Sequence, residues 1–245
     1  MSAPLARIRG GAHASVRHDS AVGHVTGKAL YLDDMPVVPG TLEAALVLSP
    51  HAHARICSID FSRALAAPGV AAAIAATDIP GRNDIAPIRS DEPLLPAEFV
   101  EYEGQPVAAL AATTFDGARA AAKLADVDYE PLPAVLTLEE AIARELYVSP
   151  PQIMQRGNLE SSFTQSTHRL SGELRCGGQD HFYLEGQIAL AIPGDAGDMF
   201  VHSSTQHPTE VQHAVANLLG LPFSAVTCEV RRMGGAFGGK ESQAT

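Results

Sequence analysis

A glycine-rich segment near the end of the sequence carries the residues most suited to chemistry. This glycine loop, residues 233–241, reads Met-Gly-Gly-Ala-Phe-Gly-Gly-Lys-Glu. Glycine permits positive φ angles and lets backbone N–H groups approach a ligand without interference from a Cβ atom. The loop is therefore predicted to bind an anionic group.

Nucleotide phosphate is the first candidate anion, because the spacing from Gly234 to Lys240 matches a P-loop up to its Gly-Lys pair. A P-loop then requires Ser or Thr to bind Mg²⁺, whereas this sequence has Glu241, whose charge would repel a triphosphate. Nucleotide hydrolysis is thus disfavoured. A tight turn whose glycines serve only packing stays open as the alternative.

Regular secondary structure is predicted directly before this loop and would hold it in place. Residues 226–230 alternate apolar and polar side chains, which predicts a half-buried strand that runs into the loop. Before it, apolar residues recur at helical spacing from 211 to 219, with Pro208 suited to a first turn and Gly220 to a C-terminal stop. Two further strands are predicted over residues 188–192 and 199–203.

The first half of the sequence predicts a separate α+β module. Thr114 is suited to cap a helix over residues 115–123. Mixed strands and short helices indicate a compact unit. The β-compatible runs, bounded by Pro, Gly or Asp, lie at residues 42–48, 55–60, 70–75, 107–112 and 125–129.

A proline-rich, polar stretch from about residue 132 to residue 171 predicts a connection between two domains. A length of 245 residues is compatible with two domains. We place the boundaries at 1–135 for the first domain, 136–170 for the linker and 171–245 for the second.

Composition excludes several classes of protein. The net charge of -11 disfavours a nucleic-acid or anionic-membrane partner, because either would approach against repulsion. No apolar run approaches the roughly 20 residues that span a bilayer, and the N-terminus lacks a signal-peptide core, so we expect a cytoplasmic location. Three widely spaced cysteines cannot build an iron–sulfur cluster by themselves: Cys57, Cys176 and Cys228.

Several motifs in order resemble the molybdenum hydroxylases, the xanthine dehydrogenase and aldehyde oxidase family. They are Gly178-Gln-Asp-His-Phe-Tyr-Leu-Glu185, then Ser204-Thr-Gln206, then the predicted helix, then Arg231-Arg and the glycine loop. Upstream, Gly23–Asp34, Ser49–Arg55 and Tyr102–Val107 are similar to the hammerhead-like domain that begins the molybdenum subunit. The resemblance implies a hammerhead-like α/β domain followed by the start of a molybdopterin-binding α+β domain.

The family pattern assigns cofactor contacts to three residues. Gln206 falls where the family has a glutamine that hydrogen-bonds an oxygen ligand of molybdenum. This glutamine does not itself coordinate the metal. Phe237 matches the family's loop phenylalanine at the cofactor, and Gly238 follows it with an amide that would face the metal centre. The alternatives are a capping role for Gln206 and a core anchor for Phe237.

Glu241 is the residue most relevant to substrate choice. Xanthine-oxidising members are similar to this sequence in having glutamate directly after Gly-Gly-Lys, where it hydrogen-bonds the purine ring. A partly buried carboxyl group facing ring nitrogens would stabilise charge redistribution. The alternative is a surface glutamate paired with Lys240.

Histidine pairs provide a weaker metal hypothesis. His51 with His53, and His207 with His213, have no third ligand at a spacing that defines a zinc site. In the family, the dithiolene sulfurs of molybdopterin hold the metal, so protein ligands are not required.

The resemblance implies oxidation of hypoxanthine and xanthine to urate. Molybdenum-bound hydroxide attacks the ring carbon, a hydride moves to the metal's sulfido group, and electrons pass through Fe–S clusters and FAD to NAD. We expect the Fe–S and FAD groups on a partner subunit of a bacterial heteromer. The general base and a substrate arginine are expected downstream of residue 245, which leaves no catalytic residue assigned here.

Two rival functions stay open. One is a molybdenum hydroxylase for an aldehyde or another N-heterocycle. The other is a truncated, non-catalytic fragment that only binds partner subunits. We expect the 245-residue chain by itself neither to retain the cofactor nor to oxidise purine.

Overall fold

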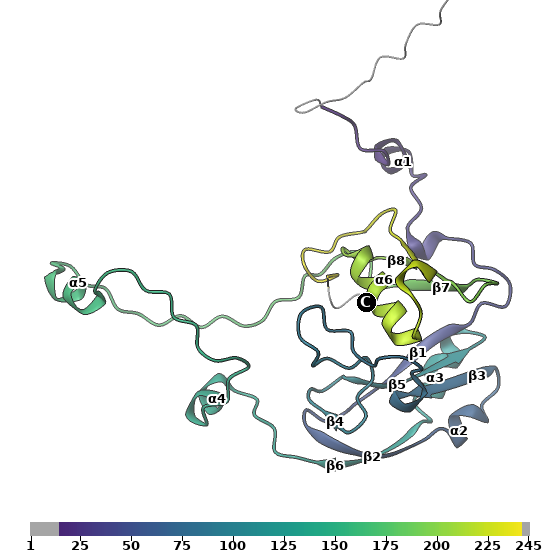
Figure 1. Cartoon of the computed structure of the whole chain (residues 1–245), viewed down its shortest axis with the longest axis horizontal. Helices are drawn as coiled ribbons and strands as arrows, with labels where there is room; N and C mark the ends of the chain where they lie inside the picture. The colour runs from purple at the N-terminus through teal and green to yellow at the C-terminus, as the bar shows by residue number, and fades with distance from the viewer. Residues whose placement is uncertain (1–14, 242–245) are drawn as a thin grey trace, which may run out of the picture.

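The computed structural model describes residues 15–241, which form two folded units joined by a long extended segment (Figure 1). The first unit spans residues 43–131 and the second spans residues 188–241. Ahead of them lie two short helices, α1 (Ala21–Thr26) and η1 (Leu32–Asp34). The α+β class predicted from the sequence is confirmed.

Two three-stranded antiparallel sheets build the first unit. One sheet has the order β1-β5-β3, with β1 at Glu43–Leu48, β5 at Pro106–Ala112 and β3 at Val70–Ala75. The other has the order β4-β2-β6, with β4 at Phe99–Val100, β2 at Ala54–Asp60 and β6 at Asp126–Pro131. Short helices α2 (Ser62–Leu65) and η2 (Ala76–Asp78) flank β3.

Small side chains let helix α3 (Phe115–Ala122) approach the first sheet closely. Ala118 and Ala121 of the helix are fully buried, and Ala118 packs with Ala112 and Ala45 of the strands. The Thr114 hydroxyl accepts a hydrogen bond from the Gly117 amide at 3.1 Å, which confirms the predicted N-cap. The core therefore relies on close packing of alanine around a few larger residues: Val47, Val100, Val107 and Leu110.

The second unit is a three-stranded sheet covered by one helix. Strand β7 (Ala189–Pro193) pairs antiparallel with β8 (Met199–Ser203), and β8 pairs parallel with β9 (Val226–Glu229). Helix α6 (Pro208–Leu219) and the turn η3 (Phe223–Ala225) make the crossover. Gly220 ends α6 in the left-handed conformation, at φ 67°, as predicted from its position.

The connection between the units extends away from both of them (Figure 1). It carries α4 (Leu138–Ala143) and α5 (Leu159–Gln165), and neither helix contains a buried residue. Leu170 and Leu174 are almost fully exposed. The domain boundaries at residues 135 and 170 stay a prediction.

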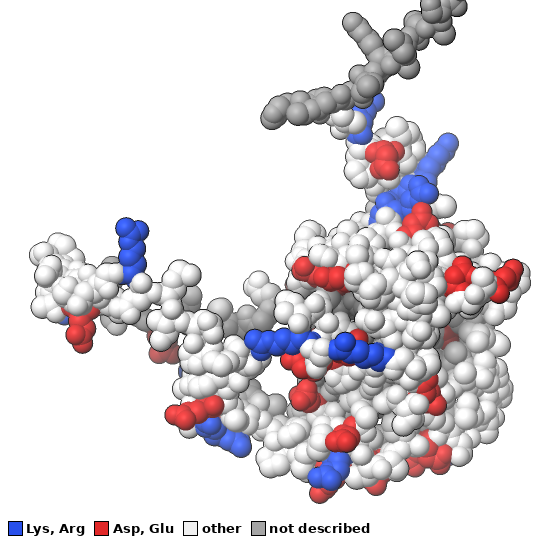
Figure 2. All heavy atoms as spheres, viewed as in Figure 1, with Lys and Arg blue, Asp and Glu red and all other residues white. Residues whose placement is uncertain are grey.

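On the face shown in Figure 2, most of the surface is uncharged, and Asp and Glu side chains are scattered among Lys and Arg side chains. The net charge of the whole sequence is -11. Within residues 15–241, no helix is long and apolar enough to cross a membrane.

The two units meet where a loop after β3 caps the end of α6. The amides of Gly81 and Arg82 donate to the carbonyls of Leu218 and Asn217, each at 2.8 Å. These carbonyls belong to the last turn of α6, which lacks intrahelical donors. A Cβ atom at Gly81 would collide with the Asn217 carbonyl, so only glycine allows this approach.

We therefore expect Gly81→Ala to weaken the contact between the units. Loss of two hydrogen bonds predicts a decrease of about 2 kcal/mol in the free energy of unfolding. Urea denaturation measures this decrease, and hydrogen exchange should become faster at Arg82. Gly172→Ala, where a Cβ meets nothing within 4 Å, is the matched control and should change stability by less than about 0.5 kcal/mol. Equal effects of the two variants would contradict this account.

Candidate functional site

The glycine loop and the β8–α6 connection lie at one edge of the second sheet because β8 and β9 are parallel. Parallel strands place their carboxyl ends at the same edge. Residues 204–207 follow β8, and residues 230–241 follow β9. Segments 35 residues apart in sequence therefore meet, as in the contact between Thr205 and Lys240.

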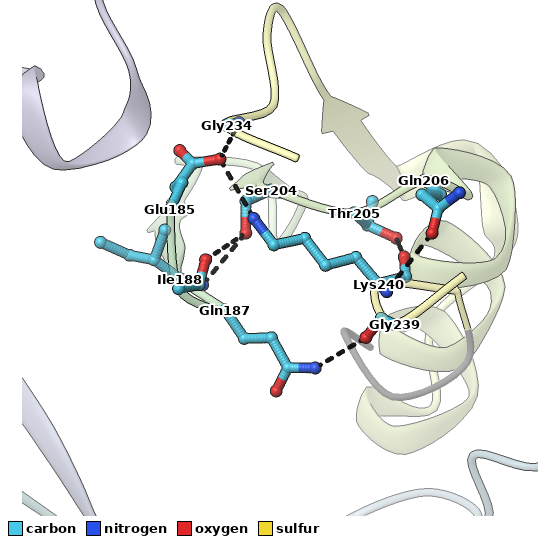
Figure 3. Close-up of polar contacts among 10 residues, drawn as sticks. Glu185, Gln187, Ile188, Ser204, Thr205, Gln206, Gly234, Gly239 and Lys240 are labelled. Atoms are coloured by element: carbon cyan, nitrogen blue, oxygen red, sulfur yellow. Dashed lines mark hydrogen bonds and ion pairs between the residues drawn. The ribbon is translucent and has the colours of Figure 1, made fainter. Parts of the chain in front are cut away.

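A single carboxylate oxygen links the two ends of the glycine loop (Figure 3). Oε2 of Glu185 accepts a hydrogen bond from the Gly234 amide at 2.9 Å and lies 3.1 Å from Nζ of Lys240. The Lys240 side chain is 0% exposed, and its ammonium group also lies 4.9 Å from the centre of the Tyr183 ring. A buried ammonium group requires such a partner, so Glu185 and Lys240 together define the closed shape of the loop.

The β8–α6 connection holds the last residues of the loop. The backbone N–H of Gln206 donates to the Lys240 carbonyl at 2.7 Å, and the Thr205 hydroxyl donates to the same oxygen at 3.2 Å. On the other side, Nε2 of Gln187 donates to the Gly239 carbonyl at 3.0 Å. These hydrogen bonds fix the backbone of Gly239 and Lys240, the two residues that precede Glu241.

The Gln206 side chain has a defined orientation. Its Oε1 accepts from the amides of Gly238 at 2.9 Å and Lys240 at 3.4 Å. Its Nε2 has no partner within residues 15–241. The amide group is therefore held with its oxygen toward the loop and two N–H donors available to a ligand. This geometry is compatible with the expected donation to an oxygen of the cofactor, which stays a prediction.

Three successive loop amides form a second set of donors. Within the described residues, the N–H groups of Gly235, Ala236 and Phe237 have no hydrogen-bond partner. Gly235 and Phe237 both have positive φ angles, of 107° and 55°. Consecutive amides in such conformations form anion-binding concavities. The Gly238 amide donates to Gln206 Oε1 in this structure, and the expected contact of Gly238 with the cofactor stays a prediction.

Phe237 is not a core anchor. Its side chain is 75% exposed. The alternative interpretation of this residue as core is therefore wrong, and its ring lies free to contact a ligand.

Packing explains two of the loop's glycines. A Cβ atom at Gly234 would lie 2.5 Å from Cβ of Glu185, and one at Gly239 would lie 2.7 Å from Nδ1 of His181. The loop thus contacts residues 181–185 too closely for any side chain at these positions. The alternative of a tight turn whose glycines serve only packing therefore holds for Gly234 and Gly239. It does not account for the unpartnered N–H groups of residues 235–237.

Glu241 contacts a histidine and not the neighbouring Lys240. Its Oε1 lies 3.1 Å from Nε2 of His207, and its side chain is 54% exposed. The carboxyl group is thus about half exposed, and its expected contact with a purine ring stays a prediction. The alternative pairing with Lys240 is wrong, because the Lys240 ammonium points into the interior toward Glu185.

The histidine pairs considered for zinc have other contacts. Nδ1 of His53 lies 2.8 Å from the Pro133 carbonyl, and the His51 ring packs edge-on against Tyr129. His213 stacks on Phe223. Among residues 15–241, no group of three or more His, Cys, Asp or Glu side chains could hold a metal ion.

Sequence reasoning missed the structural importance of Glu185 and Lys240. Glu185 closes the motif Gly178–Glu185, which carries part of the family resemblance. A signal was present, because Glu185 directly follows Tyr183 and Leu184, and a carboxylate beside such residues needs a partner when it becomes buried.

Breaking the Glu185–Lys240 pair should destabilise the second unit. Removing one partner leaves an uncompensated buried charge, so Glu185→Gln and Lys240→Met should each lower the free energy of unfolding by about 3–5 kcal/mol. The double variant should lose much less than the sum of both. Chemical denaturation measures all three.

The matched control is the exposed pair of Arg144 and Glu140, 3.0 Å apart. Arg144→Met should cost no more than about 0.5 kcal/mol. Additive losses for Glu185→Gln and Lys240→Met would show that the two side chains are not coupled.

Comparison with known families divides the chain into two matched regions. Residues 26–133 match the family described as aldehyde oxidase and xanthine dehydrogenase, a/b hammerhead domain. Residues 145–245 match the molybdopterin cofactor-binding domain. The second match begins inside the segment expected to be a linker.

Similar proteins carry several different activities in their names. The chain is 44% identical to xanthine dehydrogenase of Oryza sativa subsp. japonica over 232 residues, or 93% of this chain, and 41% identical to aldehyde oxidase 4 of Cavia porcellus over 227 residues, or 92%. It spans 17% of the length of each of these curated relatives.

Solved structures share the fold over most of the chain. Aldehyde oxidoreductase from Desulfovibrio gigas superimposes with a TM-score of 0.78 at 31% identity, over 90% of this chain and 26% of that one. Quinoline 2-oxidoreductase from Pseudomonas putida 86 also gives 0.78, at 28% identity, over 94% of this chain and 32% of that one. The chain belongs to the xanthine dehydrogenase and aldehyde oxidase family of molybdenum hydroxylases and combines its hammerhead domain with a molybdopterin cofactor-binding domain.

Proposed function

We propose that the complete enzyme oxidises hypoxanthine and xanthine to urate. The observation that supports this proposal is the juxtaposition of Glu241 with Gln206 and the free amides of the glycine loop. This arrangement places the Glu241 carboxylate, which can accept from ring N–H groups, near N–H donors suited to oxygen ligands. The names of similar proteins include xanthine dehydrogenases, aldehyde oxidases and a quinoline oxidoreductase, so family membership by itself leaves the substrate open.

The residues present fit a molybdopterin cofactor. Nε2 of Gln206 offers two donors, and the amides of Gly235, Ala236 and Phe237 offer a concavity for an anionic or oxo group. When bound, the cofactor supplies the metal at which a ring carbon is hydroxylated and two electrons are accepted. The exposed Phe237 ring would shield this region from water and strengthen its electrostatic interactions.

Glu241 has the chemistry to orient a purine. Its carboxylate accepts hydrogen bonds from ring N–H groups, and a charge-assisted bond of this kind is stronger than a neutral one. Its exposure leaves room for a planar substrate beside the loop. Aldehydes lack the ring N–H groups and would gain little from this carboxylate.

Electron transfer requires groups that this chain does not supply by itself. Cys57 and Cys176 are exposed and Cys228 is half-buried, and all three are free thiols in separate parts of the chain. We propose that Fe–S clusters and FAD lie on a partner subunit and pass electrons to NAD. The general base is also proposed to come from sequence outside residues 1–245, which would leave this chain inactive when alone.

Substrate competition in the complete, cofactor-loaded enzyme tests the proposal. We expect xanthine and hypoxanthine to be oxidised with a higher kcat/KM than benzaldehyde or quinoline. Glu241→Ala should lower kcat/KM for xanthine roughly 10- to 100-fold, because it removes a hydrogen bond to a charged group. A preference for benzaldehyde that Glu241→Ala leaves unchanged would favour the aldehyde-oxidising alternative.

Gln206 provides a separate test of the cofactor contact. Gln206→Ala should lower the rate with every substrate about 10- to 100-fold, as expected for a residue that orients a metal's ligand. The Mo(V) electron paramagnetic resonance signal should change with it. Gln187→Ala is the matched control, since the Gln187 side chain also hydrogen-bonds the loop backbone, at the Gly239 carbonyl, and has no assigned cofactor contact. An unchanged signal in Gln206→Ala would contradict the assignment.

A further inference from the structure

His207 lies between two carboxylates at the start of helix α6. Its Nε2 is 3.1 Å from Oε1 of Glu241, and its Nδ1 is 3.5 Å from Oε1 of Glu210. The first distance is within hydrogen-bonding range, whereas the second is at the outer limit. The shorter of the two contacts therefore joins His207 to Glu241.

The backbone of His207 is held by the same connection that closes the glycine loop. Its amide donates to the Thr205 hydroxyl at 3.0 Å, and this hydroxyl donates to the Lys240 carbonyl at 3.2 Å. His207 is also the residue directly after Gln206. One short connection thus carries the side chain expected to contact the cofactor and the side chain that contacts Glu241.

Glu210 supports the imidazole from the opposite side. It lies in the first turn of α6, and its Oε2 is buried without a hydrogen-bond partner among the described residues. Asp84 and His213 line the same cavity of about 190 Å³. The imidazole thus lies with Nδ1 toward Glu210 and Nε2 toward Glu241.

A glutamate that is 54% exposed would otherwise adopt several rotamers. The 3.1 Å contact with His207 favours one position of the carboxylate beside the residue that follows Gln206. We infer that His207 is a positioning residue that orients Glu241 and thereby selects purines over aldehydes. This inference rests on the proposed function, because it assigns a role within that same site.

Two substitutions of His207 in the complete, cofactor-loaded enzyme separate this role from general stability. His207→Leu removes the donor and should raise the KM for xanthine about 10-fold, with a smaller change in kcat. His207→Gln places an amide donor where Nε2 lies and should stay within about 3-fold of the wild type. The dissociation constant of urate, measured by calorimetry, should follow the same order. Benzaldehyde kinetics should stay unchanged in both variants.

A double variant and a control on the same helix complete the test. His207→Leu should add nothing to the loss already caused by Glu241→Ala, because both act through one carboxylate. His213→Leu, whose ring stacks on Phe223 away from the loop, should leave the urate affinity unchanged.

The outcomes distinguish the inference from the function on which it rests. An unchanged KM and urate affinity in His207→Leu, alongside losses in Glu241→Ala, would overturn the role of His207 and leave purine oxidation standing. Equal losses with xanthine and benzaldehyde, or failure of His207→Gln to restore binding, would also overturn it. A wild-type enzyme that neither binds urate nor oxidises purines would instead overturn the proposed function.

Discussion

The geometry of the site depends on the carboxylate of Glu185, which the Gly234 amide and the Lys240 ammonium share. An ammonium group with 0% exposure is stable only beside a compensating charge, so Lys240 can be buried only if residues 181–185 cross the loop. That crossing leaves no space for a Cβ atom at Gly234 or Gly239. One electrostatic requirement thus accounts for the closed loop and for two of its glycines.

Sheet topology provides the second constraint. Because β8 and β9 run parallel, the residues that follow them leave the sheet at one edge, and α6 must cross over between them. Gln206 and His207 consequently lie beside the glycine loop rather than at the opposite end of the sheet. Had β8 and β9 been antiparallel, these side chains and Glu241 would be separated by the length of a strand.

Helix α6 connects this site to the first unit. Its start carries His207 and Glu210, and its last carbonyls accept hydrogen bonds from the Gly81 and Arg82 amides. The hammerhead domain therefore contacts the helix at the end away from the glycine loop. A rigid helix held at both ends keeps the β8–α6 connection in a constant position, which a site built from loops requires.

The sequence by itself determined the local elements of this protein, because periodicity and capping act over a few residues. It predicted α3 with its Thr114 cap, α6 with its Gly220 stop, nearly all of the strands and the identity of the loop. The two-residue strand β4 was missed because it is too short to show a period. Only the tertiary structure decided the partners of the charges: Lys240 neighbours Glu241 in sequence yet binds Glu185, 55 residues away, and Glu241 binds His207. Which charges meet depends on burial and on the parallel pairing of distant strands, and no local pattern encodes either.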